Sequence, residues 1–232
     1  MSLLPGLPVN YRKAGDPVIA SYNWVDVADG TGIVKFYGLT SQTTPSILNT
    51  SAIASKTIET QGAPPAGASY GLVVDLTFDT NVLSSPRTLK GTAVFNVAGG
   101  MYKIGGGDVS YYPAIRVCKW DGTTETQITS ASGAVVALHA AATYEKAAND
   151  NTIQVTIPET DFKVGESIRI VSQFYGIGNG SIPLAMGHSP QNYDTTNAVG
   201  GIITIGIYAG QPQVQKCNYT NFIAYLPFKI MD

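Results

Sequence analysis

The chain has 232 residues, of which 44% are hydrophobic and 13% charged, and its formal net charge is −2. So small a net charge offers no global attraction for nucleic acid or for an anionic membrane, and no apolar run approaches the roughly 20 residues that span a bilayer. These properties argue against a coiled coil, a membrane-spanning helix and a basic DNA-binding protein, and the length is sufficient to bury a large core.

The start of the chain predicts an extended arm. Residues 1–17 lack the apolar alternation of a strand, and two prolines interrupt their short apolar stretch. No charged segment precedes that stretch, so it is not typical of a secretory signal peptide. We therefore expect an N-terminal arm on a protein that is made in the cytoplasm of its host.

The next segments predict β-strands. Residues 18–27 and 32–39 are rich in β-formers and flank Asp29-Gly30, which indicates a hairpin. Residues 55–60 predict a weaker strand. Residues 69–80 alternate strongly, with Leu72, Val74, Leu76 and Phe78 expected on one face and Val73, Asp75, Thr77 and Asp79 on the other.

The rest of the chain continues this pattern, with one exception. The further predicted strands cover residues 87–98, 111–120, 125–130, 152–158, 166–176, 201–208 and 222–230. The exception is the Ala-rich segment 137–149, whose composition predicts one short helix.

Many short strands without a shift in composition predict one domain over residues 18–232. The expected fold is all-β: an antiparallel β-sandwich with the N-terminal arm and at most one short helix. Long connections such as residues 176–200 favour a jelly roll over a simple meander, and we expect this connection to project as a loop.

Catalytic groups are scarce in this sequence. The conventional bases are His139 and His188, and His188 lies in a polar loop with Ser189 and Asp194; three such partners normally come from distant segments, so hydrogen bonding within the loop is the preferred interpretation. A glycosidase would need two facing carboxylates. The glutamates available for such a pair are Glu59, Glu125, Glu145, Glu159 and Glu166. None has a setting that indicates a raised pKa, so no catalytic residue is predicted.

Metal and cofactor sites are not predicted either. Asn149-Asp150-Asn151, and Asp26 with Asp29, could give oxygen ligands to calcium, but turn formation explains such residues better. Cys118 and Cys217 are interpreted as buried thiols, with a disulfide as the alternative. The glycine clusters at residues 105–108 and 176–180 do not lead into a helix, as a phosphate-binding loop requires.

Aromatic side chains are the remaining candidates for ligand binding. They could stack on a sugar, although packing in the core or at an interface is more usual in a sandwich. The candidates are Trp24, Tyr111, Tyr112, Trp120, Tyr193, Tyr208 and Tyr219. Tyr193, in a polar loop, is the one singled out as exposed.

The low content of charged residues indicates how the surface is used. A soluble monomer usually carries roughly 25–35% charged residues on its surface, more than this chain can supply. Copies of the same chain could cover part of that surface, and symmetric association is the simplest way to do so.

Three segments carry a resemblance to a known group of proteins. They are Y-N-W-V-D-V-A-D-G-T-G-I-V-K-F-Y-G at residues 22–38, F-K-V-G-E-S-I-R-I at 162–170 and L-P-F-K-I at 226–230. Together with the arm, they resemble virion accessory proteins of tailed bacteriophages, which have a jelly-roll fold and decorate capsids or form head fibres. The resemblance implies trimers, an arm that docks on the shell and no catalytic residues.

The function predicted from the sequence is therefore that of a non-enzymatic structural protein of the virion. Its leading form is a capsid decoration or stabilising protein that docks on the major capsid protein as a homotrimer, with no nucleic acid, membrane or cofactor as partner. The alternatives are a tail or fibre adhesin that binds a host surface glycan, and the major capsid protein itself.

Overall fold

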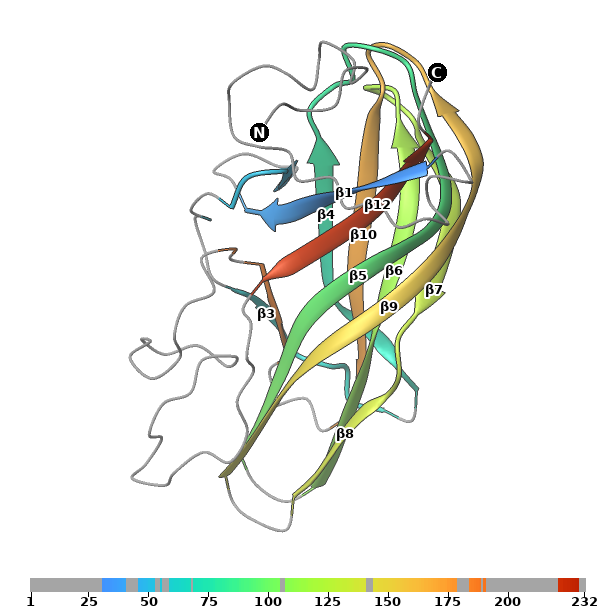
Figure 1. Ribbon diagram of the computed structural model, residues 1–232. Helices are drawn as coiled ribbons and strands as arrows, with labels where there is room; N and C mark the ends of the chain where they lie inside the picture. The colour runs from blue at the N-terminus through green and yellow to red at the C-terminus, as the bar shows by residue number, and fades with distance from the viewer. Residues whose placement is uncertain are drawn as a thin grey trace.

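A computed structural model describes residues 31–40, 46–52, 55, 59–67, 69–104, 107–140, 144–178, 184–188, 190 and 221–229. All regular elements in these residues are β-strands (Figure 1). The same part of the chain holds no helix long and apolar enough to cross a membrane. The predicted arm at 1–17 and the predicted strands at 18–27 and 201–208 lie outside the described residues.

Eight strands pair in a nested order. They are β1 (Thr31–Leu39), β4 (Gly71–Thr80), β5 (Arg87–Ile104), β6 (Gly107–Trp120), β7 (Glu125–Ser132), β9 (Tyr144–Phe162), β10 (Ser167–Ile177) and β12 (Phe222–Lys229). The antiparallel pairs are β1 with β12, β4 with β10, β5 with β9, and β6 with β7. Such nesting results when one long hairpin is wound into two sheets, which is the topology of a jelly roll.

The two sheets have the orders β1-β12-β5-β9 and β4-β10-β6-β7. Figure 1 shows the first crossing in front of the second, with the long pair of β5 and β9 running the length of the molecule. The predicted all-β sandwich with jelly-roll topology is confirmed.

Four short strands extend this framework. They are β2 (Ser46–Asn49), β3 (Glu59–Gly62), β8 (Val136–Ala140) and β11 (Leu184–Gly187). β2 is antiparallel to β1 and parallel to β4, so it joins the two sheets along one edge. β8 pairs with β6, and β11 lies between β5 and β3.

The core fills the space between the sheets. Strand alternation directs one side chain in two inward, so Ile153, Val155 and Ile157 of β9 are buried while the residues between them face solvent. The Phe78 and Phe222 rings stack across the sandwich with centroids 4.7 Å apart. A Cβ on Gly38 of β1 would lie 2.6 Å from the Phe222 ring, so only glycine fits at this position.

The helix predicted for residues 137–149 is wrong. The described residues of this segment belong to β8 and β9. β9 pairs with β5 as far as Ile104, and β8 pairs with the start of β6. These long strands offer backbone hydrogen-bonding groups that need a partner, and pairing with them overrides the helix propensity of an Ala-rich segment.

The predicted faces of β4 are correct only in part. Phe174 of β10 pairs with Val74, but the next residue, Tyr175, pairs with Leu72, so β4 contains a bulge at Val73. A bulge adds one residue and reverses the alternation beyond it. Leu72 is therefore 47% exposed, whereas Val73 packs against the core.

The connection at residues 176–200 also differs from the prediction in its described part. We expected it to project, yet β11 within it is completely buried. Its backbone pairs with both β5 and β3, so this segment completes the first sheet.

Candidate functional site

The outer face of the sheet β4-β10-β6-β7 carries the most distinctive polar and aromatic side chains. Its register places Arg169 of β10 between Asp79 of β4 and Cys118 of β6. Six residues further along β10, Tyr175 lies between Leu72 and Tyr112. The two ends of this face therefore differ in chemistry.

At the first end, four charged side chains form what we call the arginine network: Asp79, Arg116, Glu125 and Arg169. Arg169 donates from Nε and Nη2 to the two carboxylate oxygens of Asp79, each at 2.7 Å. Its guanidinium carbon lies 3.7 Å from the centre of the Trp120 ring. The hydrogen bonds to Asp79 are the main reason why the pKa of Arg169 is raised. Such a bidentate, stacked arginine is held in one position.

Glu125 of β7 links the rest of the network. It accepts hydrogen bonds from Arg169 at 3.3 Å and from Arg116 at 3.1 Å. The Cys118 thiol lies beneath, 3.6 Å from the same carboxylate. Burial, and then the charge of Glu125, raise the pKa of Cys118 to about 12. A thiol that stays protonated at neutral pH is a poor nucleophile.

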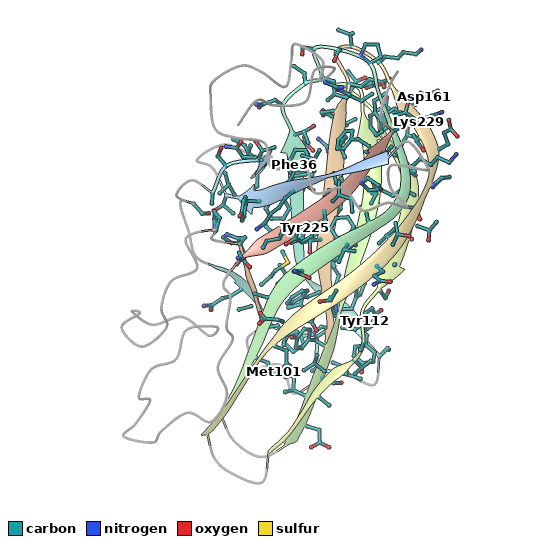
Figure 2. All side chains as sticks on the ribbon, viewed as in Figure 1. Phe36, Met101, Tyr112, Asp161, Tyr225 and Lys229 are labelled. Carbon is teal, nitrogen blue, oxygen red and sulfur yellow. The ribbon has the colours of Figure 1, made fainter. Side chains whose placement is uncertain are left out.

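At the other end lies the tyrosine patch, which consists of Tyr70, Leu72, Tyr112 and Tyr175. The Tyr112 and Tyr175 rings stack with centroids 5.3 Å apart, and Tyr70 meets Tyr112 edge-on at 5.1 Å. Tyr70 is 38% exposed and Leu72 47%. Figure 2 shows Tyr112 well apart from Asp161 and Lys229, which lie near the opposite end of the molecule.

Polar groups border the tyrosine patch. The Tyr175 hydroxyl donates to Gln173 at 3.2 Å, and the Gln173 amide donates to Asp75 at 3.3 Å. The Tyr70 hydroxyl lies 2.8 Å from that of Ser110. The exposed Tyr70 ring and the half-buried rings beside it can stack on a ligand, while the Ser110 hydroxyl and the exposed Asp75 carboxylate can hydrogen-bond to it.

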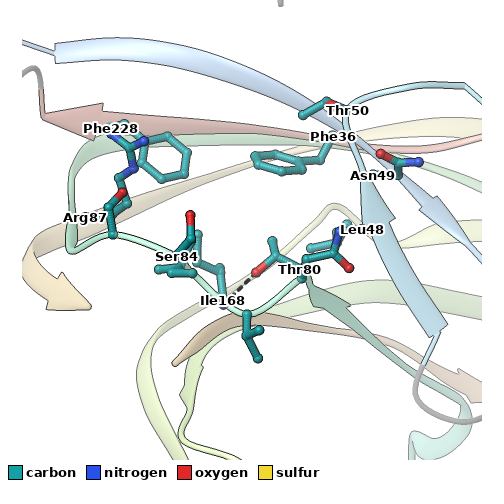
Figure 3. A pocket seen from close by; sticks show the side chains of 13 residues that line it. Phe36, Leu48, Asn49, Thr50, Thr80, Ser84, Arg87, Ile168 and Phe228 are labelled. Carbon is teal, nitrogen blue, oxygen red and sulfur yellow. Dashed lines mark hydrogen bonds between the residues drawn. The ribbon is translucent and has the colours of Figure 1, made fainter. Parts of the chain in front are cut away.

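A third feature is a hollow of about 230 Å³ beside β1 and β2, which we call the Arg87 hollow (Figure 3). Phe36, Leu48 and Phe228 form apolar walls. Arg87 lies with Phe228 on one side of it, and Asn49 and Thr50 lie on the other. Arg87 is half-buried and makes no ion pair with another described residue.

Of the two histidines that could act as bases, only the His188 side chain lies in the part of the chain that the structure describes, and it does not form a catalytic site there. His188 is completely buried, with Nε2 3.0 Å from the Thr60 hydroxyl. A ring in that position does not reach a ligand in solvent. Ser189, Asp194 and the His139 side chain lie outside the described part of the chain.

The described glutamates all lie beside cations rather than beside one another. Glu125 belongs to the arginine network, Glu159 lies within 3.1 Å of Lys90 and 2.9 Å of Lys229, and Glu166 lies 3.4 Å from Lys119. Hydrogen bonds from Lys229 and then Lys90 lower the pKa of Glu159, whereas a general acid needs a raised one. The Glu59 and Glu145 side chains lie outside the described set.

The possible calcium ligands at residues 149–151 lie within β9, so their interpretation as a turn is wrong. Asn151 is buried, and its amide donates to the Val97 carbonyl at 3.2 Å and to the Tyr111 hydroxyl at 3.3 Å. Across the described residues, no group of three or more His, Cys, Asp or Glu could hold a metal. Asp26 and Asp29 lie outside them.

The remaining candidates are divided among three settings. Tyr111 is part of the core, Tyr112 belongs to the tyrosine patch, and Trp120 stacks on Arg169. Cys118 is a buried free thiol. The described residues do not include Trp24, Tyr193, Tyr208, Cys217 or Tyr219.

Several residues of these sites were not predicted as site residues, among them Tyr70, Arg87, Arg116, Arg169 and Tyr175. The alternation of the strand at 166–176 places Arg169 and Tyr175 on one face. The partners that meet them come from strands up to 90 residues away, and one sequence does not show that pairing.

Comparison with known proteins assigns this chain to no family. No protein-family model and no curated protein matches the sequence. An alpha-amino acid ester hydrolase is similar to 83% of this chain, with 10% identity and a TM-score of 0.47. A CocE/NonD family hydrolase from Staphylococcus aureus is similar to 86%, with 12% identity and a TM-score of 0.45. A chain in the structure of infectious bursal disease virus, Gt strain, is similar to this chain over 87% of its residues, with 10% identity and a TM-score of 0.25.

These likenesses correct one prediction. We expected a protein that is not an enzyme, and that prediction is contradicted because the solved structures that resemble the chain include hydrolases. The chain spans only 36–37% of the length of those hydrolases. At 10–13% identity and TM-scores of 0.39–0.47, the similarity assigns no catalytic residue to this chain.

Proposed function

We propose that this chain is a structural protein of a virus particle, a decoration or stabilising jelly roll that docks on the major capsid protein as a homotrimer. In this proposal residues 1–17 are the docking arm. The observation that supports it best is a pair of exposed apolar side chains on two adjoining loops, which we call the valine tip.

The valine tip consists of Val82 and Val164, on the loops before β5 and before β10. Their side chains are 69% and 61% exposed. The two loops are joined by backbone hydrogen bonds, from Leu83 to the Glu166 carbonyl at 2.8 Å and from Gly165 to the Leu83 carbonyl at 3.0 Å. Two apolar side chains are thus held in fixed positions where solvent reaches them.

Charge supports the same interpretation. Many of the described charged side chains pair with one another, as in the arginine network and in the Lys90, Glu159 and Lys229 group. Internal pairing leaves a surface with little free charge. The centres of protein–protein interfaces are similarly depleted of charged residues and include apolar anchors.

Substitution at the valine tip tests the proposal. The double variant Val82→Asp/Val164→Asp should lose self-association, measured by light scattering after size exclusion, and co-sedimentation with the purified shell. Val135→Asp is the matched control, because Val135 is 57% exposed on a different loop. Unchanged assembly by the double variant would overturn the role of the valine tip.

Three further measurements test the rest of the proposal. Deletion of residues 1–17 should abolish shell binding while the thermal unfolding of the sandwich is unchanged. A clean monomer at micromolar concentration would count against the homotrimer. The copy number in purified particles separates the possible places: hundreds of copies mean decoration or the shell itself, and a dozen or fewer mean a tail or vertex.

A second candidate function, recognition of a host glycan, is favoured by the tyrosine patch. An exposed tyrosine ring with an exposed carboxylate nearby, here Tyr70 and Asp75, suits neutral sugars, which offer C–H faces and hydroxyls. A glycan array should then give saturable binding that Tyr70→Ala abolishes. Tyr37→Ala is a suitable control, because Tyr37 belongs to the other sheet.

A further inference from the structure

We propose that the Arg87 hollow binds a carboxylate group that carries a short apolar body. This inference goes beyond a role in assembly and does not depend on it. It rests on the hollow, on the charge of Arg87 and on the polar and apolar side chains that line the hollow together.

The first observation is the setting of Arg87, at the start of β5. An arginine guanidinium in a protein commonly pairs with a carboxylate through charge-assisted hydrogen bonds. In this protein Arg169 and Arg116 do so, but half-buried Arg87 has no acidic partner among the described residues. Arg87 therefore offers a fork of hydrogen-bond donors to the hollow that it lines.

The second observation is that polar and apolar side chains both line the hollow. Ser84, Ser85 and Asn81 line the hollow with hydroxyl and amide groups, while Phe36 and Phe228 provide apolar surface (Figure 3). A ligand that fits both parts has a polar end and an apolar body. The Thr80 hydroxyl is already engaged, since it accepts a hydrogen bond from the Ile168 backbone at 3.0 Å.

Charge and size select the ligand class. A single guanidinium balances one negative charge, and its planar fork matches the two oxygens of a carboxylate. A phosphate dianion would keep an unbalanced charge there. The volume of about 230 Å³ is below the roughly 300–1,000 Å³ of pockets for larger ligands, so the body must be small, such as one aromatic ring.

Such a group has two sources, a free small carboxylate or the C-terminal residue of a polypeptide. Benzoate represents the first, with benzamide as its neutral control. A short peptide that ends in phenylalanine with a free carboxylate represents the second, and its C-terminal amide is the control. Binding to the full chain is measured by calorimetry and by chemical-shift changes in NMR spectra.

The expected result is binding of benzoate, of the free-acid peptide or of both, at least tenfold tighter than that of the neutral controls. Arg87→Gln should weaken this binding about 10- to 100-fold, which is the range expected for a lost charge-assisted hydrogen bond. Arg87→Lys should retain part of it, because lysine keeps the charge but not the fork. Arg116→Gln, which removes an arginine from a different face, should leave it unchanged.

The pattern of binding also identifies the source. Binding of benzoate alone supports a small-molecule site, and binding of the free-acid peptide alone supports a site for a polypeptide terminus. Any of three results would overturn the proposal. The acids and their amides could bind equally well, Arg87→Gln could leave binding unchanged, or neither acid could bind at millimolar concentration. Thermal unfolding of each variant confirms that the sandwich is intact, and none of these readouts involves the assembly of a particle.

Discussion

The arginine network and the tyrosine patch occupy the same outer face of one sheet, yet they meet solvent in opposite ways. In the network, the side chains of Arg169 and Asp79 are only 11% and 12% exposed, and their hydrogen-bonding groups are directed at each other. In the patch, Tyr70 is 38% and Leu72 47% exposed. The charged end is therefore internally satisfied, while the aromatic end has surface available to a partner.

This difference shows that charge alone does not mark a functional site. An arginine with two carboxylates and a buried thiol has the residue types of a reactive centre. Its geometry is that of a structural clamp, because each polar atom is already paired and the thiol is kept protonated. The less polar end is the better candidate for recognition.

The reactivity of cysteine should show the largest contrast between the two ends. In a Cys217→Ser background, native Cys118 should react with a thiol reagent at pH 8 about a thousandfold more slowly than Leu72→Cys, a thiol placed in the tyrosine patch. The reason is the thiolate fraction, since the pKa of Cys118 is about 12 instead of 9.0. Similar rates at the two positions would show that the network does not shield its thiol.

The same raised pKa predicts how stability depends on pH. Folding favours the protonated thiol of Cys118, so this contribution is complete below the unfolded pKa near 9.0 and is lost as the pH rises toward about 12. Cys118→Ala should therefore lose less stability than the parent over that interval in denaturant unfolding. Parallel curves for the two proteins would contradict the shift.

The next effect concerns the clamp in the arginine network, the ion pair between Arg169 and Asp79. Asp79→Ala should lower the free energy of unfolding by about 2–4 kcal/mol, because it leaves a largely buried guanidinium with only the weaker contact to Glu125. Denaturant unfolding measures this loss. The double variant Asp79→Leu/Arg169→Met removes both charges and should cost clearly less, so an equal cost would refute the clamp.

Much of this fold could be predicted from the sequence, and the sites much less. The alternation of residues 69–80 predicts a strand with Asp79 opposite Phe78, which the structure confirms. The bulge at Val73 left no signal, because it depends on pairing with β10. The sequence predicts a helix at 137–149 by local propensity, whereas pairing with β5 and β6 decides its structure.

A smaller effect is expected within the tyrosine patch. Tyr112→Ala removes the stacked contact with Tyr175 and the edge contact with Tyr70. We expect a loss of about 1–2 kcal/mol in the free energy of unfolding, from the two aromatic pairs. Tyr112→Phe keeps both rings in contact and should be nearly neutral. A loss as large as that of Asp79→Ala would mean that the patch supports the fold as much as the clamp does.

The smallest effect should come from Leu72, which tests whether the aromatic end is open. Leu72→Ser should change the free energy of unfolding by no more than about 0.5 kcal/mol, since Leu72 is already 47% exposed to water. Val74→Ser is the matched control two residues away: Val74 is 2% exposed, and a hydroxyl in its place should cost several times more. A uniform alternation along β4 would instead direct both side chains into the core and make both substitutions costly. The ratio of the two losses therefore reports the bulge at Val73, and with it the turning of Leu72 toward the tyrosine patch.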